Sequence, residues 1–281
     1  MHVEIALCQI RPAMGDPEYN IQVVTDMITS TGSDVLVFPE CFLTGYGADV
    51  SDMFGRISAG ISDISNLCRK YDKAVAIGTP MKTPKGIANS IAFLSPDGDS
   101  FYDKTHLARF GIYSEDGYVA GHRPVVASYH GIRFGLSICY DIYFPEVLHA
   151  CSLNMADVNI CVSAAAVPSA PFFERILPAR ALENVTYLAF VNNVGPMHGL
   201  EMAGGSKAFD PLGNEIASCG QKECVVPFDF DTETLAEARR IRRHLVDFRR
   251  DIDWLPSCRL RVENEIPNSW LGSESCNDFD L

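Results

Sequence analysis

The sequence has little positive charge, no signal-peptide pattern and no long apolar run. Lys and Arg number 23 against 36 Asp and Glu, which gives a net charge of −13. A nucleic-acid groove needs clustered positive charge, so nucleic acid is not an expected partner. No apolar stretch approaches the roughly 20 residues of a membrane-spanning helix. The first residues lack the basic and apolar regions of a signal peptide. We therefore expect a soluble, cytoplasmic protein that contacts no membrane.

The sequence also lacks closely spaced cysteine pairs. Its ten cysteines are scattered, and no two of them form a Cys-x-x-Cys motif. This spacing argues against structural zinc. In a reducing cytosol, most of these cysteines are expected to be small buried hydrophobic residues. A reactive cysteine must therefore be distinguished by its surroundings.

The composition is typical of a globular protein. Of 281 residues, 47% are hydrophobic and 21% are charged, which is enough apolar surface for a core. The length fits one large domain or two ordinary ones.

Both halves of the chain predict the same order of elements. In the first half, strands are predicted over 3–10, 34–38 and 74–79, helices over about 18–30 and 62–71, and a hairpin over 90–94 and 100–103. In the second half, strands are predicted over 132–138, 157–163 and 187–194, helices over 145–153 and 172–186, and a hairpin over 205–209 and 215–218. The hairpin turns, Ser95-Pro-Asp-Gly98 and Asp210-Pro-Leu-Gly213, occupy the same place in each half.

This repetition predicts an α/β fold of two similar layered halves that share one core, with mixed sheets facing each other and helices outside. We expect a single domain over 1–281 with a polar tail from about 272, although the pattern leaves a two-domain arrangement open. The tail is either disordered or a contact between subunits.

A last strand over 225–230 and a capped helix over about 232–245 are expected after the second half. This region is rich in arginine, and two interpretations of it remain, a solvated helix face and an anion-binding site. Its arginines are Arg239, Arg240, Arg242, Arg243, Arg249 and Arg250.

Cys139 differs from the other cysteines in its surroundings. It ends a predicted strand and precedes a turn that runs into a helix. A thiol at such a corner points into the crevice at the carboxyl end of the strand, where open α/β sheets bind ligands. The helix N-terminus favours the thiolate. The alternative is an inert buried cysteine, which is the commoner case.

Three charged residues could serve such a thiol, whereas none of the seven histidines has a cysteine-protease setting. Glu40 follows an apolar strand, and burial would raise its pKa toward that of a general base. Lys104 ends the first hairpin and could stabilise an oxyanion. Glu115, 11 residues later, could hold Lys104 protonated and oriented. Each could instead be an ordinary surface or turn residue.

These residues lie in segments that resemble the nitrilase superfamily of carbon-nitrogen hydrolases, whose signature is a Glu-Lys-Cys triad in this chain order. The similarity extends over roughly residues 3–250. The matching segments are Val37-Phe-Pro-Glu40, Asp103-Lys-Thr-His-Leu107, Ile138-Cys-Tyr-Asp141, Ala179-Arg-Ala-Leu-Glu-Asn184, Asn192-Asn193 and Asp210-Pro-Leu-Gly213.

The resemblance implies a four-layer αββα sandwich and a role for each matching residue. It implies that Cys139 attacks an amide carbon to give a thioester and that Glu40 is the base. It implies that Lys104 and the Tyr140 N–H form the oxyanion hole, and that Glu115 positions Lys104 or the substrate. Glu183 and Asn184 are expected to support the fold, and the chemistry requires no metal or organic cofactor. The resemblance also implies a homo-oligomer built on a dimer.

The sequence departs from several subfamilies at Tyr143, where members that bind carboxylate-bearing substrates often have arginine. Without this arginine, no carboxylate clamp is evident, unless Arg109 or Arg175 supplies the cation. True nitrilases have Cys-Trp-Glu, whereas Tyr140 and Asp141 follow Cys139 here. The sequence therefore favours a small amide over a nitrile or a carbamoyl amine.

The expected substrate site contains Tyr46, Tyr140, Tyr143 and Ala164. The alanines around Ala164 could leave space for a substrate, or could simply pack a tight loop. Two other functions remain open, a glutaminase-like subunit that feeds ammonia to a partner and a non-catalytic oligomeric scaffold. The scaffold is less favoured, because burying Cys, Lys and two Glu without a role is costly.

Overall fold

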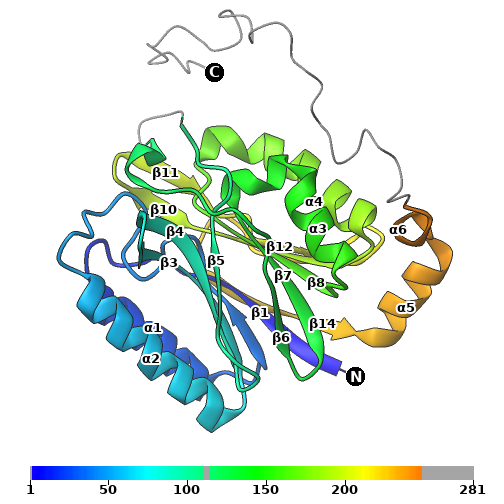
Figure 1. The fold of residues 1–281 in the computed structure, drawn as a ribbon, viewed down its shortest axis with the longest axis horizontal. Coiled ribbons are helices and arrows are strands. Elements are labelled where there is room, and N and C mark those ends of the chain that lie inside the picture. The colour runs from blue at the N-terminus through cyan, green and yellow to red at the C-terminus, as the bar shows by residue number, and fades with distance from the viewer. Residues whose placement is uncertain (1, 110–113, 249–281) are drawn as a thin grey trace, which may run out of the picture.

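Two six-stranded mixed sheets face each other, and helices cover their outer surfaces (Figure 1). The computed structural model describes residues 2–109 and 114–248 of the chain. The predicted α/β sandwich of two similar halves is confirmed.

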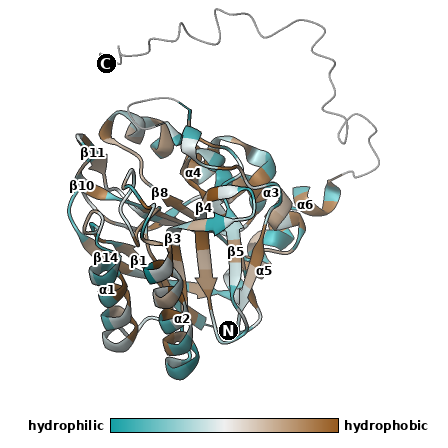
Figure 2. Cartoon of the chain, turned by 60° about the vertical axis from the view of Figure 1, so that its left-hand side comes forward, coloured by the Kyte–Doolittle hydropathy of each residue, from teal (hydrophilic) through white to brown (hydrophobic). Residues whose placement is uncertain are grey.

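The first sheet has the strand order β14-β1-β2-β3-β4-β5. Strands β1, β2 and β3 are parallel to one another, and the others pair antiparallel to their neighbours. Helices α1 and α2 lie side by side against this sheet (Figure 2). The bounds are β1 (His2–Gln9), α1 (Pro17–Ser30), β2 (Val35–Val37), α2 (Phe54–Tyr71), β3 (Ala74–Thr83), β4 (Gly86–Leu94), β5 (Ser100–Asp103) and β14 (Cys224–Asp231).

The second sheet has the order β13-β12-β9-β8-β7-β6, with β7, β8 and β9 parallel. Its helices are α3 and α4, and two short strands, β10 and β11, pair separately. The bounds are β6 (Val126–Tyr129), β7 (Ile132–Ile138), α3 (Pro145–Leu153), β8 (Val158–Ser163), α4 (Ala170–Asn184), β9 (Tyr187–Asn192), β10 (Val194–Met197), β11 (Leu200–Ala203), β12 (Lys207–Phe209) and β13 (Glu215–Ser218). Short 3-10 turns η1 (Glu115–Gly117), η2 (Cys139–Tyr143) and η3 (Val167–Ser169) lie between these elements.

One apolar core lies between the sheets. Leu7, Val37 and Phe93 of the first sheet and Phe134 and Val162 of the second belong to it. Alternate residues of these strands face the opposite way, into separate apolar layers beneath the helices. The strands are therefore buried on both faces, as their nearly continuous apolar sequences indicate.

Helix α2 begins at Phe54, eight residues before the predicted start. The early part contains Gly55 and Gly60, which lower helix propensity, so the sequence did not predict a helix there. Gly60 lies against α1, where a Cβ would lie 2.1 Å from Cδ1 of Ile21. The close packing of the two helices therefore compensates for the low propensity.

Strands β3 and β4 are also longer than predicted, and strands β6, β10 and β11 were not predicted. The extension of β4 back to Gly86 matters for the site, because Asn89 lies in it.

The predicted helix over 232–245 is wrong at its end. Helix α5 (Thr232–Ile241) stops where Arg242 becomes extended, and a single turn, α6 (His244–Asp247), follows. Arg239 docks α5 on the second half by donating to Asp157 and to the Ala156 carbonyl. The exposed Arg240 and Arg243 pair with acidic residues of their own segment, as a solvated face would.

Arg249, Arg250, the expected tail from 272, Cys258 and Cys276 lie outside the described residues. All eight cysteines that the structure describes are free thiols. Within 2–109 and 114–248, no helix is long and apolar enough to cross a membrane.

Candidate active site

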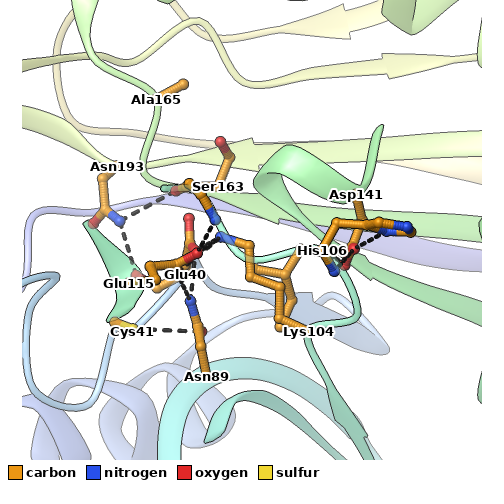
Figure 3. A network of polar contacts seen from close by, with 12 residues as sticks. Glu40, Cys41, Asn89, Lys104, His106, Glu115, Asp141, Ser163, Ala165 and Asn193 are labelled. Atoms are coloured by element: carbon orange, nitrogen blue, oxygen red, sulfur yellow. Dashed lines mark hydrogen bonds and ion pairs between the residues drawn. The ribbon is translucent and has the colours of Figure 1, made fainter. Parts of the chain in front are cut away.

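The carboxyl ends of parallel strands bring the predicted residues together. Glu40 follows β2, Lys104 follows β5, and Cys139 follows β7. Strand β5 is antiparallel to β4, which is antiparallel to β3, so β2 and β5 end at the same edge. Figure 3 shows Glu40, Lys104 and Glu115 converging there.

Lys104 is held between two carboxylates. Its Nζ lies 2.8 Å from Oε1 of Glu40 and 2.9 Å from each carboxylate oxygen of Glu115. All three side chains are almost completely buried. Burial alone lowers the pKa of Lys104, but the negative charges of Glu40 and Glu115 raise it well above its usual value. Lys104 is therefore a fixed ammonium ion.

Glu115 is oriented by more than Lys104. Its Oε2 accepts a hydrogen bond of 2.7 Å from the Ala108 N–H, and its backbone N–H donates to the Ala108 carbonyl. These bonds tie η1 to the segment after Lys104. The structure thus places Glu115 in the site, as expected, rather than on a surface turn.

Asn89 of β4 is a site residue that the sequence analysis missed. Its Nδ2 donates to Oε1 of Glu40 and to Oε1 of Glu115, both at 2.7 Å. The strand was predicted to begin at Ser90, so no signal placed Asn89 at the sheet edge. Its position opposite Pro80 in the β3–β4 hairpin follows from the longer strands.

Glu40 has one carboxylate oxygen without a donor. Oε1 accepts from Lys104 and Asn89, whereas Oε2 is buried and has no hydrogen-bond partner among the residues that the structure describes. Burial raises the pKa of Glu40, Glu115 adds to the rise, and Lys104 and Asn89 oppose it. The predicted direction of this shift is confirmed, and Oε2 is the oxygen available to take a proton.

Gly78 of β3 allows the loop of Glu40 to lie close against the sheet. A Cβ at Gly78 would lie 2.3 Å from the Pro39 carbonyl oxygen and 2.6 Å from Cα of Glu40. Asn193 fixes the other side of this loop, because its Nδ2 donates to the Glu40 carbonyl and to the Ser163 carbonyl. Glu40 belongs to the first half and Ser163 ends β8 in the second, so the side chain of Asn193 connects the two halves (Figure 3).

Cys139 occupies a sharp turn between β7 and η2. Its φ of +46° lies in the left-handed region, which is unfavourable for a residue with a Cβ. The fully buried Asp141 holds this turn by accepting from the Ile138 N–H and from the Tyr102 hydroxyl. Arg180 supports the other end by donating to the Ile142 carbonyl.

The Cys139 thiol is protonated at rest. Burial raises its pKa to about 12, and the charge of Glu40 adds to the rise. Lys104, the Ser163 hydroxyl and the Ala164 N–H oppose the rise without cancelling it. The net shift is upward, so the expected preference for the thiolate is wrong: the short turn η2 follows Cys139, and helix α3 begins only at Pro145. A base is needed to activate this thiol.

A second thiol, Cys41, lies next to Glu40 in the chain. It is 1% exposed, and its Sγ donates to Oδ1 of Asn89 at 3.5 Å. Cys139 is only half-buried. Since a nucleophile must reach a substrate, this difference in exposure favours Cys139 over Cys41 for that role.

Of the four expected substrate residues, Tyr143 and the Ala164 N–H lie near Cys139, and Tyr140 packs on Tyr143. Burial raises the pKa of Tyr46, and the charges of Glu40 and Glu115 raise it further, which places Tyr46 beside the carboxylates. Tyr118, which the sequence analysis missed, is similarly affected. The ring of Tyr143 lies 5.7 Å from that of Tyr140 and 5.6 Å from that of Phe173.

The remaining residues that the sequence analysis named lie on α4 or on the surface. Glu183 accepts a hydrogen bond from Arg180, and Asn184 donates to the Arg180 carbonyl, so both support α4 and η2. Arg109 is exposed and lies 3.7 Å from Asp116, and Arg175 is exposed on α4. In the described ranges, no group of three His, Cys, Asp or Glu residues is arranged to hold a metal ion.

Known proteins are similar to this chain in sequence. The model of the family described as "Carbon-nitrogen hydrolase" matches residues 4–240. An (R)-stereoselective amidase of a Pseudomonas species is 31% identical over 270 residues, covering 94% of each chain. A 2-oxoglutaramate amidase of Bacillus subtilis is 28% identical over 88% of this chain and 98% of its own.

Solved structures are similar to this chain in fold. A CN-hydrolase superfamily protein of Xanthomonas campestris, with an arsenic adduct in its active site, has a TM-score of 0.79 at 26% identity and covers 90% of this chain and 99% of its own. A variant amidase of Nesterenkonia, in complex with butyramide, has a TM-score of 0.74 at 26% identity over 85% and 95% of the two chains. The match over 4–240, together with the predicted sandwich and signature segments, shows that the chain belongs to the carbon-nitrogen hydrolase family of the nitrilase superfamily and is a carbon-nitrogen hydrolase.

Proposed function

We propose that the protein hydrolyses a small amide to a carboxylic acid and ammonia through a thioester on Cys139. The observation that carries this proposal is the difference between the two carboxylate oxygens of Glu40. One oxygen is held by Lys104, while the buried Oε2 lacks a partner among the described residues. A base with a raised pKa therefore lies beside a thiol that needs deprotonation.

The reaction takes two steps. Sγ of Cys139 attacks the carbonyl carbon while Glu40 takes the thiol proton and passes it to the leaving nitrogen, releasing ammonia. Water then attacks the thioester; Glu40 takes its proton and returns it to the departing sulfur. Lys104 and the Tyr140 N–H stabilise the oxyanion in both steps. Glu115 positions Lys104.

Tyr143 supports a neutral amide. Its half-buried aromatic ring, packed on Phe173, offers no bidentate cation for a carboxylate. Tyr46, Tyr140 and Ala164 complete the proposed substrate site. The butyramide complex of the Nesterenkonia amidase concerns a neutral amide, whereas the Bacillus subtilis relative is named for 2-oxoglutaramate.

Ammonia release distinguishes the alternatives. Wild type and Cys139→Ala would be compared on butyramide, a carboxylate-bearing amide, a nitrile and a carbamoyl amine. We expect the wild type to turn over butyramide fastest and Cys139→Ala to be inactive. If the wild type preferred the nitrile or the carbamoyl amine, the amide proposal would be wrong. If both proteins were inactive on the whole panel, the non-catalytic scaffold would be favoured.

We also propose a cytoplasmic homo-oligomer built on a dimer, as the family resemblance implies. Sedimentation equilibrium of the full chain tests the assembly. A monomer at micromolar concentration would contradict it.

A further inference from the structure

Asn89 closes a ring of hydrogen bonds with the charged groups of the site. Its Nδ2 donates to the same two oxygens, Oε1 of Glu40 and Oε1 of Glu115, that Lys104 contacts. The Asn89 side chain is completely buried. Both hydrogens of its amide are therefore committed to carboxylates, and each of these carboxylate oxygens receives one neutral and one charged donor.

The amide of Asn89 is fixed in this orientation. Cys41 donates its thiol to Oδ1, which directs Nδ2 toward the carboxylates. The backbone carbonyl of Asn89 accepts from the Lys104 N–H at 2.8 Å, so the residues that carry the two donors are joined directly. The donors are thus preorganised before any substrate arrives.

This ring explains which oxygen of Glu40 is available. Because Lys104 and Asn89 both bind Oε1, the carboxylate cannot rotate without losing two buried hydrogen bonds. Oε2 then remains without a partner within the described part of the chain. Tight bonding of one oxygen and freedom of the other are what a base requires.

We propose that Asn89 is a positioning residue, which fixes Glu40 with Oε2 toward the reacting proton and stabilises its carboxylate form. This inference rests on the proposed roles of Glu40 and Cys139. It predicts that loss of the Asn89 amide makes Glu40 easier to protonate, so that the enzyme loses its base at a higher pH.

Other ionisable groups around Glu40 remain in place when Asn89 is changed. They come from the segment after β5, from η1, from η2 and from the loop of Glu40 itself. They are Lys104, Glu115, Tyr118, Cys139, Cys41 and Tyr46. A shift on changing Asn89 therefore reports its hydrogen bonds.

The test measures alkylation of Cys139 by iodoacetamide as a function of pH, read by peptide mass spectrometry. It compares wild type, Asn89→Ala, the isosteric Asn89→Asp and the control Ser90→Ala. Ser90 is the buried neighbour of Asn89 on β4, and its hydroxyl bonds Asp103 instead of the two carboxylates. Alkylation requires no knowledge of the amide substrate, so failure of the amide proposal appears separately, in the ammonia assay.

We expect the acid limb of the alkylation profile to move up by about one pH unit in Asn89→Ala and further in Asn89→Asp, which adds a negative charge. Ser90→Ala should leave the limb in place. Only the pH range in which each variant is folded is compared, because an unfolded Cys139 would react with the ordinary thiol pKa of about 8.5. A lower rate with an unmoved midpoint in both Asn89 variants would show a structural role only and overturn the proposal.

Discussion

The carboxylate of Asp141 accepts a hydrogen bond of 3.1 Å from the backbone N–H of Ile138, across the turn that carries Cys139. The same carboxylate accepts from the Tyr102 hydroxyl at 2.7 Å and from the His106 N–H at 2.9 Å. Tyr102 lies in β5 of the first sheet, so the turn that carries Cys139 in the second half is bonded to the first half. These bonds offset the strain of the positive φ at Cys139.

Replacing Asp141 with alanine should destabilise the protein by about 3 kcal/mol, because several buried donors lose their acceptor at once. Asp141→Asn should cost less, since its amide oxygen can still accept. Urea unfolding of the three proteins measures this difference. An Asp141→Ala variant within about 0.5 kcal/mol of wild type would contradict this account of the turn.

Gly78→Ala should displace the loop of Glu40. The new Cβ would meet backbone atoms of Pro39 and Glu40, which cannot rotate away as a flexible side chain can. We expect a loss of about 2 kcal/mol in stability and about 100-fold in kcat/KM. Gly55→Ala is the matched control, because outside its chain neighbours and the backbone of its own helix no described atom lies within 4 Å of the Cβ position there. Equal behaviour of the two variants would show that close packing at Gly78 does not position Glu40.

The activity should have an acid limb above the ordinary glutamate range. Glu40 acts as a base only when deprotonated, so kcat/KM falls as the pH falls through its raised pKa. The raised pKa values of Lys104 and Cys139 predict no basic limb below about pH 9. The pH profile of kcat/KM on butyramide checks both statements. An acid limb at or below the usual glutamate pKa of about 4.3 would contradict the raised pKa.

Tyr143→Arg should shift specificity toward carboxylate-bearing amides. A guanidinium there could form the bidentate contact that the tyrosine ring cannot. We expect the ratio of kcat/KM for a carboxylate-bearing amide to that for butyramide to rise about tenfold or more. Tyr143→Phe, which keeps the ring, should leave the ratio unchanged. If wild type already prefers the charged amide, Tyr143 does not exclude it.

Much of this architecture is predictable from the sequence, because the parallel strands have buried apolar patterns bounded by turns. In the signature, Cys139 directly follows such a strand and Glu40 lies shortly after another, so their convergence could be anticipated. The two hairpin turns likewise marked the repetition of the halves.

The remaining features depend on tertiary contacts. Asn89 looks like an ordinary polar residue until β4 extends past it and places its amide between two carboxylates. The pKa of Cys139 could not be predicted from its turn, because burial and the charge of Glu40, which raise it, depend on the packed structure. Arg239 likewise is one of several arginines close together in the sequence, and only the structure shows that it donates to Asp157 of the second half.

The identity of the nucleophile is tested most directly by mass spectrometry of the protein after brief exposure to butyramide and acid quenching. Peptide mapping would then locate any acyl adduct. Cys41→Ala is the matched control, because it removes the other thiol near Lys104 and Glu40. We predict a butyryl adduct on Cys139 in wild type and Cys41→Ala, and none in Cys139→Ala. An adduct on Cys41, or unchanged amide hydrolysis by Cys139→Ala, would contradict the account.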